Sequence, residues 1–150
     1  MSEPTAKQPN PLPIVISAPE LWRLSFERRP DTPWVEGTDP TLNTGLGVTR
    51  TAQDEIEVEL SVSIEEGAPF SVFVGYRARF QVQSTEGLGS LEQVLSTIAA
   101  RIAPTTLYPF VREAIGNALM RAGIQAPLLP ILNFGAMFDP SEIEVPPPPD

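Results

Sequence analysis

The sequence contains no cysteine and no histidine. Without cysteine, the chain forms no disulfide, has no thiolate nucleophile and lacks the usual ligands of structural zinc. Without histidine, it also lacks the commonest general base and the commonest metal ligand. Serine–histidine–aspartate triads, cysteine–histidine dyads and histidine metal sites are therefore excluded. Carboxylates are plentiful, but no motif arranges them, so we expect neither an enzyme nor a bound cofactor or metal.

Long hydrophobic runs and positive charge are scarce as well. No apolar stretch approaches the ~20 residues that a helix needs to cross a bilayer, and residues 1–10 lack the basic and apolar parts of a secretory signal. We therefore expect no membrane insertion and a cytoplasmic protein. Ten basic residues stand against 19 acidic ones, for a net charge of −9. Since nucleic acids and anionic membranes are bound by clustered basic residues, neither is an expected partner.

Proline is abundant, at 18 of 150 residues. The prolines gather in Pro4–Pro19, Pro127–Pro130 and Pro146–Pro149. Proline-rich ends favour extended or disordered chain over packed structure. We therefore expect a proline-rich tail at residues 1–19, one domain at residues 20–140, and a proline-rich acidic tail at residues 141–150. A domain of this size can bury a hydrophobic core.

Alternation of apolar and polar residues predicts four β-strands. Residues 55–65 and 70–84 alternate strictly, which is typical of a sheet with one buried face and one wet face. Residues 20–27 and 42–49 alternate over shorter stretches. A tight turn near Gly67 would join the two clear strands as a hairpin, and the shared apolar face requires paired residue numbers with an even sum. The predicted opposite pairs are Ile64–Phe70, Glu57–Arg77 and Glu55–Arg79. A solvated charged face is the simpler explanation of these charges.

Two helices are predicted after the strands. The run from Ser90 to Gln93 is a capping-box pattern that opens a helix, and Pro104 is predicted to end it. A long helix follows, with Pro109 in its first turn and Gly123 as its left-handed C-terminal cap. Its apolar residues form one continuous stripe, made of Leu107, Phe110, Val111, Ala114, Ile115, Ala118, Leu119 and Ala122.

Strands followed by helices, without alternation, are typical of an α+β protein. We expect a four-stranded antiparallel sheet with one long and one or two short helices packed on one face.

The C-terminal half resembles the SecB protein-export chaperones. The most specific matches are Tyr108–Glu113, at the start of the long helix, and Asn133–Phe138, an Asn-Phe-x-x-x-Phe segment that follows the proline-rich crossing. Weaker matches lie in the strands, at Ser25–Glu27 and Phe80–Gly87. The resemblance implies ATP-independent holding of unfolded preproteins in apolar surface grooves by a tetramer that is a dimer of dimers. In the export branch of the family, the bound polypeptide is handed to the ATPase SecA.

The resemblance also implies roles for individual residues. The residues expected to bind client polypeptides are Trp34, Val35, Leu42, Leu46, Met137 and Phe138. Ordinary core packing, or anchoring of the loop that carries Trp34 and Val35, is an alternative interpretation of several of them. The residues expected at the oligomer interface are Arg112, Gly116 and Asn117, although a plain exposed helix face would also explain them.

The surface that contacts SecA in the family is only partly retained. Glu27 matches one of its acidic residues, whereas Arg23 and Phe73 stand where the family has two others. We therefore expect weak or no binding of SecA. Pro140 also shortens the second helix of the family to a stub. These departures favour a relative outside the main export branch, such as a dedicated chaperone that protects the antitoxin of a toxin–antitoxin pair. A non-enzymatic structural protein sharing the fold, and an enzyme using carboxylates, are further alternatives.

Overall fold

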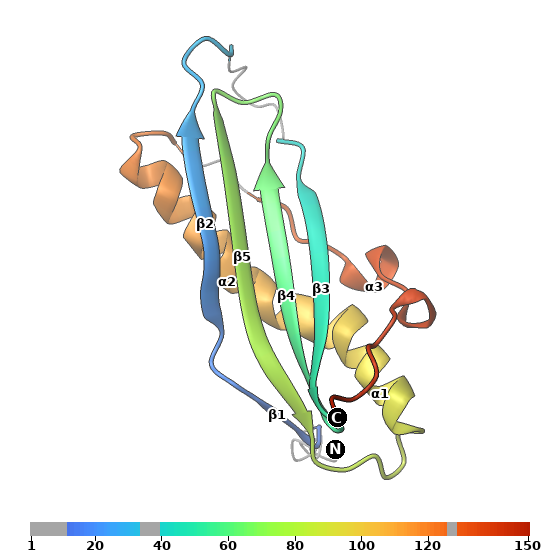
Figure 1. The fold of residues 1–150 in the computed structure, drawn as a ribbon. Helices are drawn as coiled ribbons and strands as arrows, with labels where there is room; N and C mark the ends of the chain where they lie inside the picture. The colour runs from blue at the N-terminus through green and yellow to red at the C-terminus, as the bar shows by residue number, and fades with distance from the viewer. Residues whose placement is uncertain (1–11, 34–39, 126–128) are drawn as a thin grey trace, which may run out of the picture.

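The computed structural model describes residues 12–33, 40–125 and 129–150. One antiparallel sheet is backed by a long helix that crosses it obliquely (Figure 1). The strands are β1 (Ile14–Ile16), β2 (Glu20–Arg28), β3 (Asn43–Ala52), β4 (Glu55–Ile64) and β5 (Phe70–Val82). The helices are α1 (Leu91–Thr97), α2 (Ala103–Arg121) and α3 (Phe134–Met137). The predicted α+β class is confirmed.

The fifth strand, β1, lies outside the four that the sequence predicts. β1 and β2 pair one after the other with the same side of β5, while β4 pairs with its other side and β3 with β4. In the segment between β1 and β2, the backbone N–H of Ser17 still donates to the carbonyl of Arg79 in β5 at 2.9 Å. The two short strands thus form one interrupted edge. At the other end of the chain, Ile143 and Val145 pack against the core. Segments on both sides of residues 20–140 therefore contact the domain.

The predicted register of the β4–β5 hairpin is wrong by two residues, because each residue of β4 lies opposite the residue of β5 two positions later than predicted. Ile64 lies opposite Val72, Glu57 opposite Arg79, and Glu55 opposite Gln81. The connection is wider than a tight turn, because residues 65–71 separate Ile64 from its partner Val72. Phe70, at the start of β5, pairs with Arg28 of β2. The even sum is kept, since a shift by a single residue would expose the apolar face. The predicted Glu57–Arg77 ion pair still forms, as a diagonal contact of 3.6 Å, whereas the expected Glu55–Arg79 pairing does not occur.

The helical stretch is more continuous than predicted. Pro104 does not end a helix, because a wider π-helical turn, Ile98–Ile102, joins α1 to α2 and places Pro104 in the first turn of α2. A proline there costs little, since the first backbone N–H groups of a helix have no intrahelical acceptor. Because α2 begins at Ala103, Pro109 lies inside the helix instead of in its first turn.

The predicted helix caps are confirmed. The N–H of Gln93 donates to Ser90 Oγ and the N–H of Ser90 donates to Gln93 Oε1, each at 3.2 Å. At the other end of the helical stretch, Gly123 has a φ of 73°, and the N–H of Ile124 returns to the carbonyl of Leu119 at 2.9 Å. This arrangement is the Schellman cap that favours glycine.

Replacing Ser90 with alanine is expected to lower the free energy of unfolding by about 1 kcal/mol, because the first turn of α1 loses its side-chain acceptor. Urea unfolding followed by circular dichroism would measure the change. Ser84→Ala is the control and should change stability less, because the Ser84 hydroxyl accepts from the N–H of Glu86 in the loop before the helix. Equal losses in the two variants would contradict the role assigned to the cap.

The core lies between the sheet and the helices. The inward residues of β4, from Ile56 to Ile64, and those of β5 are buried against α1 and α2, and Leu107, Val111, Ile115 and Leu119 of α2 are fully covered. The outward face of the sheet carries ion pairs, of which Arg23–Glu59 (3.3 Å) and Arg77–Glu20 (3.1 Å) are examples. Exposed pairs of this kind contribute little stability.

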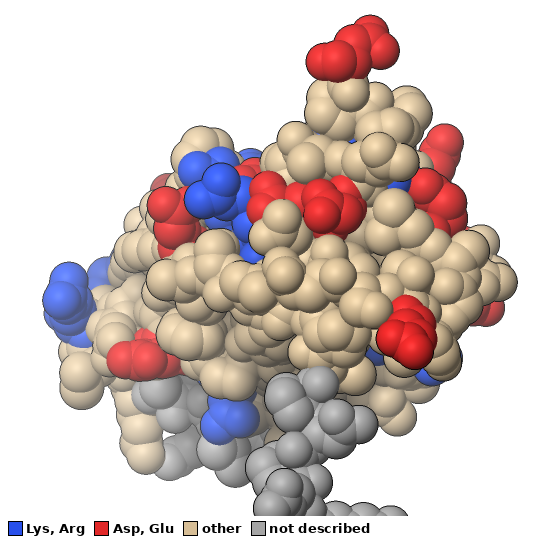
Figure 2. All heavy atoms as spheres, turned by 90° about the horizontal axis from the view of Figure 1, so that it is seen from below, with Lys and Arg blue, Asp and Glu red and all other residues tan. Residues whose placement is uncertain are grey.

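Seen from below in Figure 2, the surface carries acidic and basic side chains dispersed among uncharged ones. This face shows no continuous basic patch of the kind that binds nucleic acid.

Candidate functional site: apolar surfaces beside β2 and α3

Strand β2 presents apolar side chains at an edge of the sheet. Within the described residues, β2 pairs with β5 alone, which leaves its other edge without a strand partner. Leu21 and Leu24 lie on the face that α2 covers, yet their exposed fractions are 47% and 51%. An edge strand with exposed apolar residues is a surface that natural proteins ordinarily cover.

A bulge at Trp22 explains why Leu21 and Leu24 share a face although their numbers differ by three. The register shifts between Leu21 and Arg23. Trp22 consequently lies on the outward face, where the Arg77 guanidinium stacks over its ring at 3.4 Å. The adjacent apolar residues Leu21 and Trp22 were the sequence signal for this bulge, because they break the alternation of the strand.

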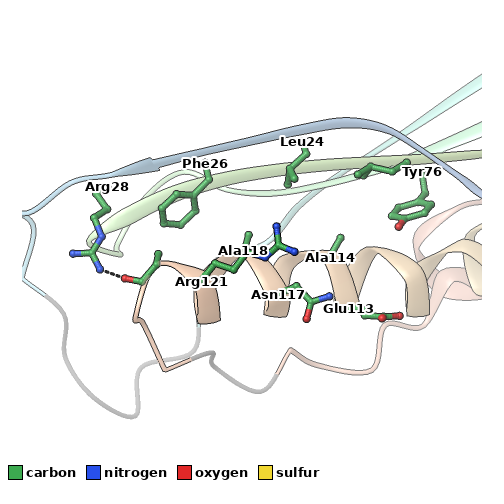
Figure 3. A pocket seen from close by; sticks show the side chains of 11 residues that line it. Leu24, Phe26, Arg28, Tyr76, Glu113, Ala114, Asn117, Ala118 and Arg121 are labelled. Carbon is green, nitrogen blue, oxygen red and sulfur yellow. Dashed lines mark hydrogen bonds between the residues drawn. The ribbon is translucent and has the colours of Figure 1, made fainter.

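A cavity of about 650 Å³ separates β2 from α2 (Figure 3). We call it the β2–α2 groove. The small side chains of Ala114 and Ala118 leave room on the helix side, and Glu113, Asn117 and Arg121 form a polar rim. The remaining lining residues are Leu21, Leu24, Phe26, Arg28, Tyr76 and Ala122.

One end of the β2–α2 groove is closed by a polar contact. Arg28 donates through Nη2 to the carbonyl of Ala122, the residue that caps α2 (Figure 3). A cation at a helix C-terminus interacts favourably with the helix dipole. The contact ties the end of β2 to the end of α2 and leaves the apolar part of the groove open.

The residues predicted at the oligomer interface lie along α2. Asn117 lines the β2–α2 groove, and Arg112 is exposed. A Cβ added to Gly116 would meet nothing within 4 Å, so no contact inside the subunit requires glycine there. The sequence analysis missed Leu21, Leu24 and Tyr76 as groove residues, because their periodicity is the same as that of core residues.

A second apolar surface lies at the proline-rich crossing and α3. Ile131 is 91% exposed and Met137 is 43% exposed. Phe138 is half-buried and stacks on Phe134, with ring centroids 6.1 Å apart. We call Ile131, Met137 and Phe138 the crossover surface. Ile131 was not singled out from the sequence, because a lone isoleucine in a proline-rich segment carries no periodic signal.

The crossing is held in place by Tyr108 of α2. Its hydroxyl donates to the carbonyl of Pro130 at 2.6 Å, and its ring meets Phe134 edge-on at 5.5 Å. Burial raises the pKa of the Tyr108 hydroxyl above its usual value, and the nearby Arg112 opposes this shift. The hydroxyl therefore stays protonated and keeps donating at neutral pH.

The other residues predicted to bind clients lie in different settings. Leu42 and Leu46 are half-buried and pack against the same core as Phe138. Leu46 lies opposite Leu60 on the inward face of the sheet. Trp34 and Val35 lie outside the described residues. The structure thus leaves Met137 exposed, whereas Phe138, Leu42 and Leu46 are only partly accessible because each packs against the core.

The predicted SecA-contact residue lies on the outward face of the sheet. Glu27 is exposed and lies opposite Ser71. The two departures from the family pattern contact each other, because Arg23 stacks over the ring of Phe73 at 5.1 Å. Arg23 also pairs with Glu59 at 3.3 Å. A cation–aromatic pair therefore occupies the outward face between β2 and β5.

Residues 12–33, 40–125 and 129–150 contain no cluster of acidic residues able to hold a metal ion. Asp139 has a lowered pKa because the backbone and side chain of Ser141 donate to its carboxylate, which is the role of a turn cap. None of the helices in this part of the chain is long and apolar enough to cross a membrane. The surfaces described above are suited to apolar docking of polypeptide.

The fold is thus an antiparallel sheet covered on one face by a long helix, with apolar side chains left exposed at β2 and α3. The family described as SecB, preprotein translocase subunit SecB, matches residues 14–144. The chain belongs to this family, whose members are non-enzymatic chaperones.

The chain is similar to protein-export proteins SecB from two bacteria. It is 35% identical to that of Saccharophagus degradans over 100 residues, which cover 65% of this chain and 56% of that protein. It is 34% identical to that of Dechloromonas aromatica over 129 residues, which cover 83% and 74%. The first match therefore spans little more than half of the relative's length.

Among solved structures, the fold is similar to a SecB-like chaperone of Mycobacterium tuberculosis, solved with a peptide of the HigA1 antitoxin. The TM-score is 0.64, and the match covers 80% of this chain and 90% of that one at 20% identity. At this identity, the similarity concerns the fold alone.

Proposed function

We propose that this protein is an ATP-independent chaperone that holds unfolded polypeptides on apolar surfaces and acts in protein export. The observation that carries the proposal is the apolar area left open on a well-packed domain at the crossover surface, where Ile131 and Met137 are 91% and 43% exposed. A soluble monomer rarely leaves such patches unused. Membership of the SecB family supports the same function.

The crossover surface is the part that we assign to client binding. Met137 is unbranched and polarizable, so it adapts to different apolar partners. Ile131 and Phe138 add apolar and aromatic area beside it. The predicted client residues Leu42 and Leu46 would border this surface through their accessible parts, and Trp34 and Val35 remain predicted contributors.

The β2–α2 groove is the part that we assign to assembly. A second copy of the chain would cover Leu21 and Leu24 and offer its own strand edge to β2. Arg112, Gly116 and Asn117 on α2 would take part in the same or an adjoining contact. The assembly would be the tetramer, a dimer of dimers, that the family resemblance implies. A cytoplasmic location follows from the same role, since preproteins are held before they cross the membrane.

The function is tested by aggregation of a chemically unfolded client. The protein at one oligomer per client should suppress light scattering after dilution from denaturant, without added ATP. Absence of any suppression at stoichiometric amounts would contradict the proposal. Bovine serum albumin at equal mass is the control for nonspecific crowding.

Replacing Met137 with serine is expected to weaken client holding about fivefold, because an exposed apolar side chain contributes on the order of 1 kcal/mol to an apolar contact. Leu88→Ser is a matched control, because Leu88 and Met137 are each 43% exposed and Leu88 lies in the loop before α1. Light scattering and size-exclusion chromatography would show whether holding changes while assembly does not. An equal effect in both variants would argue against the crossover surface.

A dedicated chaperone of a toxin–antitoxin system is the second candidate. The fold match to a SecB-like chaperone solved with an antitoxin peptide favours it, as does the Arg23–Phe73 pair on the surface expected to contact SecA. Immobilised protein would separate the two roles. Retention of SecA through Glu27 and its surroundings favours export, whereas retention of one antitoxin-like polypeptide without SecA favours the dedicated role.

A further inference from the structure

The chain after α3 lies against the domain in an extended form. Asp139 caps a 3-10 turn, Pro140–Glu142, which contacts α1. Ile143 follows with an extended backbone, at φ −81° and ψ 118°. Ile143 and Val145 are half-buried against the core, while Glu144 between them is exposed. This alternation is that of an extended segment with one face docked.

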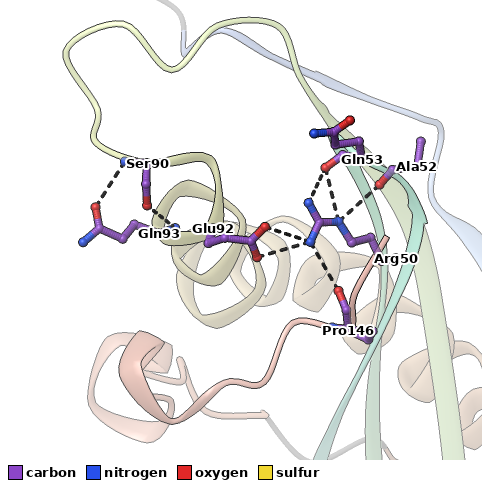
Figure 4. Close-up of polar contacts among 7 residues, drawn as sticks. All are labelled: Arg50, Ala52, Gln53, Ser90, Glu92, Gln93 and Pro146. Atoms are coloured by element: carbon purple, nitrogen blue, oxygen red, sulfur yellow. Dashed lines mark hydrogen bonds and ion pairs between the residues drawn. The ribbon is translucent and has the colours of Figure 1, made fainter. Parts of the chain in front are cut away.

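The docked segment ends on Arg50 of β3. The Arg50 side chain is 2% exposed, and its Nη1 donates to the carbonyl of Pro146 at 3.3 Å (Figure 4). Nη1 also pairs with Glu92 of α1 at 2.9 Å, and Nε and Nη2 both donate to the carbonyl of Gln53 in the β3–β4 turn. Arg50 therefore joins the start of α1, the β3–β4 turn and the C-terminal segment.

We call the surface beneath Ile143–Pro146 the α1 shelf. Ile143 and Val145 pack there against the core, and Pro146 reaches Arg50. An open cavity of about 450 Å³ lies beside the segment, lined by Glu92, Gln93, Ser96 and Thr97 of α1 together with Pro140, Ser141 and Ile143. The segment that covers the α1 shelf follows the crossover surface closely in sequence. Asp139 and the 3-10 turn Pro140–Glu142 separate Phe138 from Ile143.

The attachment of the segment is weak. In the described part of the chain, residues 143–150 have two hydrogen bonds, from the N–H of Ile143 to the carbonyl of Pro140 and from Arg50 to the carbonyl of Pro146. Pro146–Pro149 have no N–H to donate. If the segment leaves, Arg50 keeps Glu92 and the carbonyl of Gln53, so no buried cation is left unpaired. Elements with few bonds and partial burial are those that open most readily.

We propose that the α1 shelf is a second polypeptide-binding site and that Ile143–Pro146 occupies it as a built-in substitute for a client. The chemical class of ligand follows from this occupant. The ligand is an extended polypeptide segment with apolar residues at alternate positions and a proline after them, and the carbonyl of that proline accepts a hydrogen bond from Arg50. The inference rests on the proposed chaperone function. A client of this class displaces the segment and gains the shelf in addition to the crossover surface.

Ending the chain at Glu142 tests the proposal. A fluorescent peptide with the sequence of residues 141–150 should bind the shortened protein, as measured by anisotropy, and should bind the full chain at least threefold more weakly. The shortened protein should also hold an unfolded client with higher affinity. Equal affinity of the two proteins for the peptide, with unchanged thermal stability, would overturn the inference.

If the shortened chain does not fold, Ile143→Ser/Val145→Ser in the full chain replaces it, with Glu144→Ser as the matched control. The double variant should bind the peptide more tightly than the control, because its own segment no longer competes. Hydrogen exchange at the amide of Ile143, which donates to the carbonyl of Pro140, should speed up when client is added to the unaltered protein. No change in exchange and no difference between these variants would reject the α1 shelf. A full chain that holds no client in any form would instead reject the proposed function.

Discussion

Leu24→Asp is expected to abolish assembly of this protein and, with it, most of its ability to hold unfolded clients. Leu24 is half-exposed on the edge strand β2 and lines the β2–α2 groove. In a two-fold interface the change occurs twice, so two carboxylates would lose their hydration at one contact. At a few kcal/mol for each unpaired charge, the dissociation constant should rise at least about a hundredfold. Light scattering coupled to size-exclusion chromatography would measure the mass.

Ser25→Asp is the control for the added charge. Ser25 is the next residue of the same strand, is exposed, and faces the outward side of the sheet opposite Phe73. It should leave mass and holding unchanged. A Leu24→Asp protein with the mass of the unaltered assembly would show that subunits do not meet at the β2–α2 groove. A smaller assembly that still holds client fully would separate assembly from holding.

Phe80→Ala is expected to cause the largest loss of stability. Phe80 is fully buried near the end of β5, between Ile56 of β4 and Ile16 of β1, on the sheet face that the helices cover. Removing a buried phenylalanine side chain costs about 3–5 kcal/mol, because apolar contacts are lost and a cavity remains. Since small domains are stable by roughly 5–15 kcal/mol in total, much of the variant should unfold in mild denaturant. Urea titration followed by circular dichroism at fixed protein concentration would measure the loss.

Phe73→Ala is the matched control on the same strand. Phe73 lies on the outward face, where it stacks with Arg23, so its removal should cost on the order of 1 kcal/mol or less. Comparable losses for Phe73 and Phe80 would mean that the outward face is covered in the assembled protein. That result would place a second interface on the open side of the sheet.

Local chemistry explains which structural predictions succeeded. The capping box at Ser90 and the glycine cap at Gly123 depend on residues within one turn of each other, so sequence was sufficient. The even-sum rule for β4 and β5 also held, because burial of an apolar face selects it. The exact pairing was predicted wrongly, because every even sum buries the same apolar face and alternation does not report how many residues form the connection between Ile64 and Val72.

The same distinction between local signals and distant packing applies to the surface residues. Asn133–Phe138 was recognised as a motif, and the structure leaves Met137 43% exposed, while its role in client binding stays a prediction. Leu21 and Leu24 could not be distinguished from core residues, because hydrophobic periodicity gives the face of a side chain and does not report whether another element covers that face. Arg50 was also missed, since its partners Glu92 and Pro146 come from α1 and from the C-terminal segment.

Sequence alone determined the α+β order of elements, the apolar faces, the caps and, through two short motifs, the SecB family. These properties depend on neighbouring residues or on short spacings. The tertiary structure decided that β1 and β2 share one edge of β5, that the helix runs through Pro104, and that a groove remains between β2 and α2. Each of these is set by packing between distant segments, whose relative positions become fixed only when the core closes.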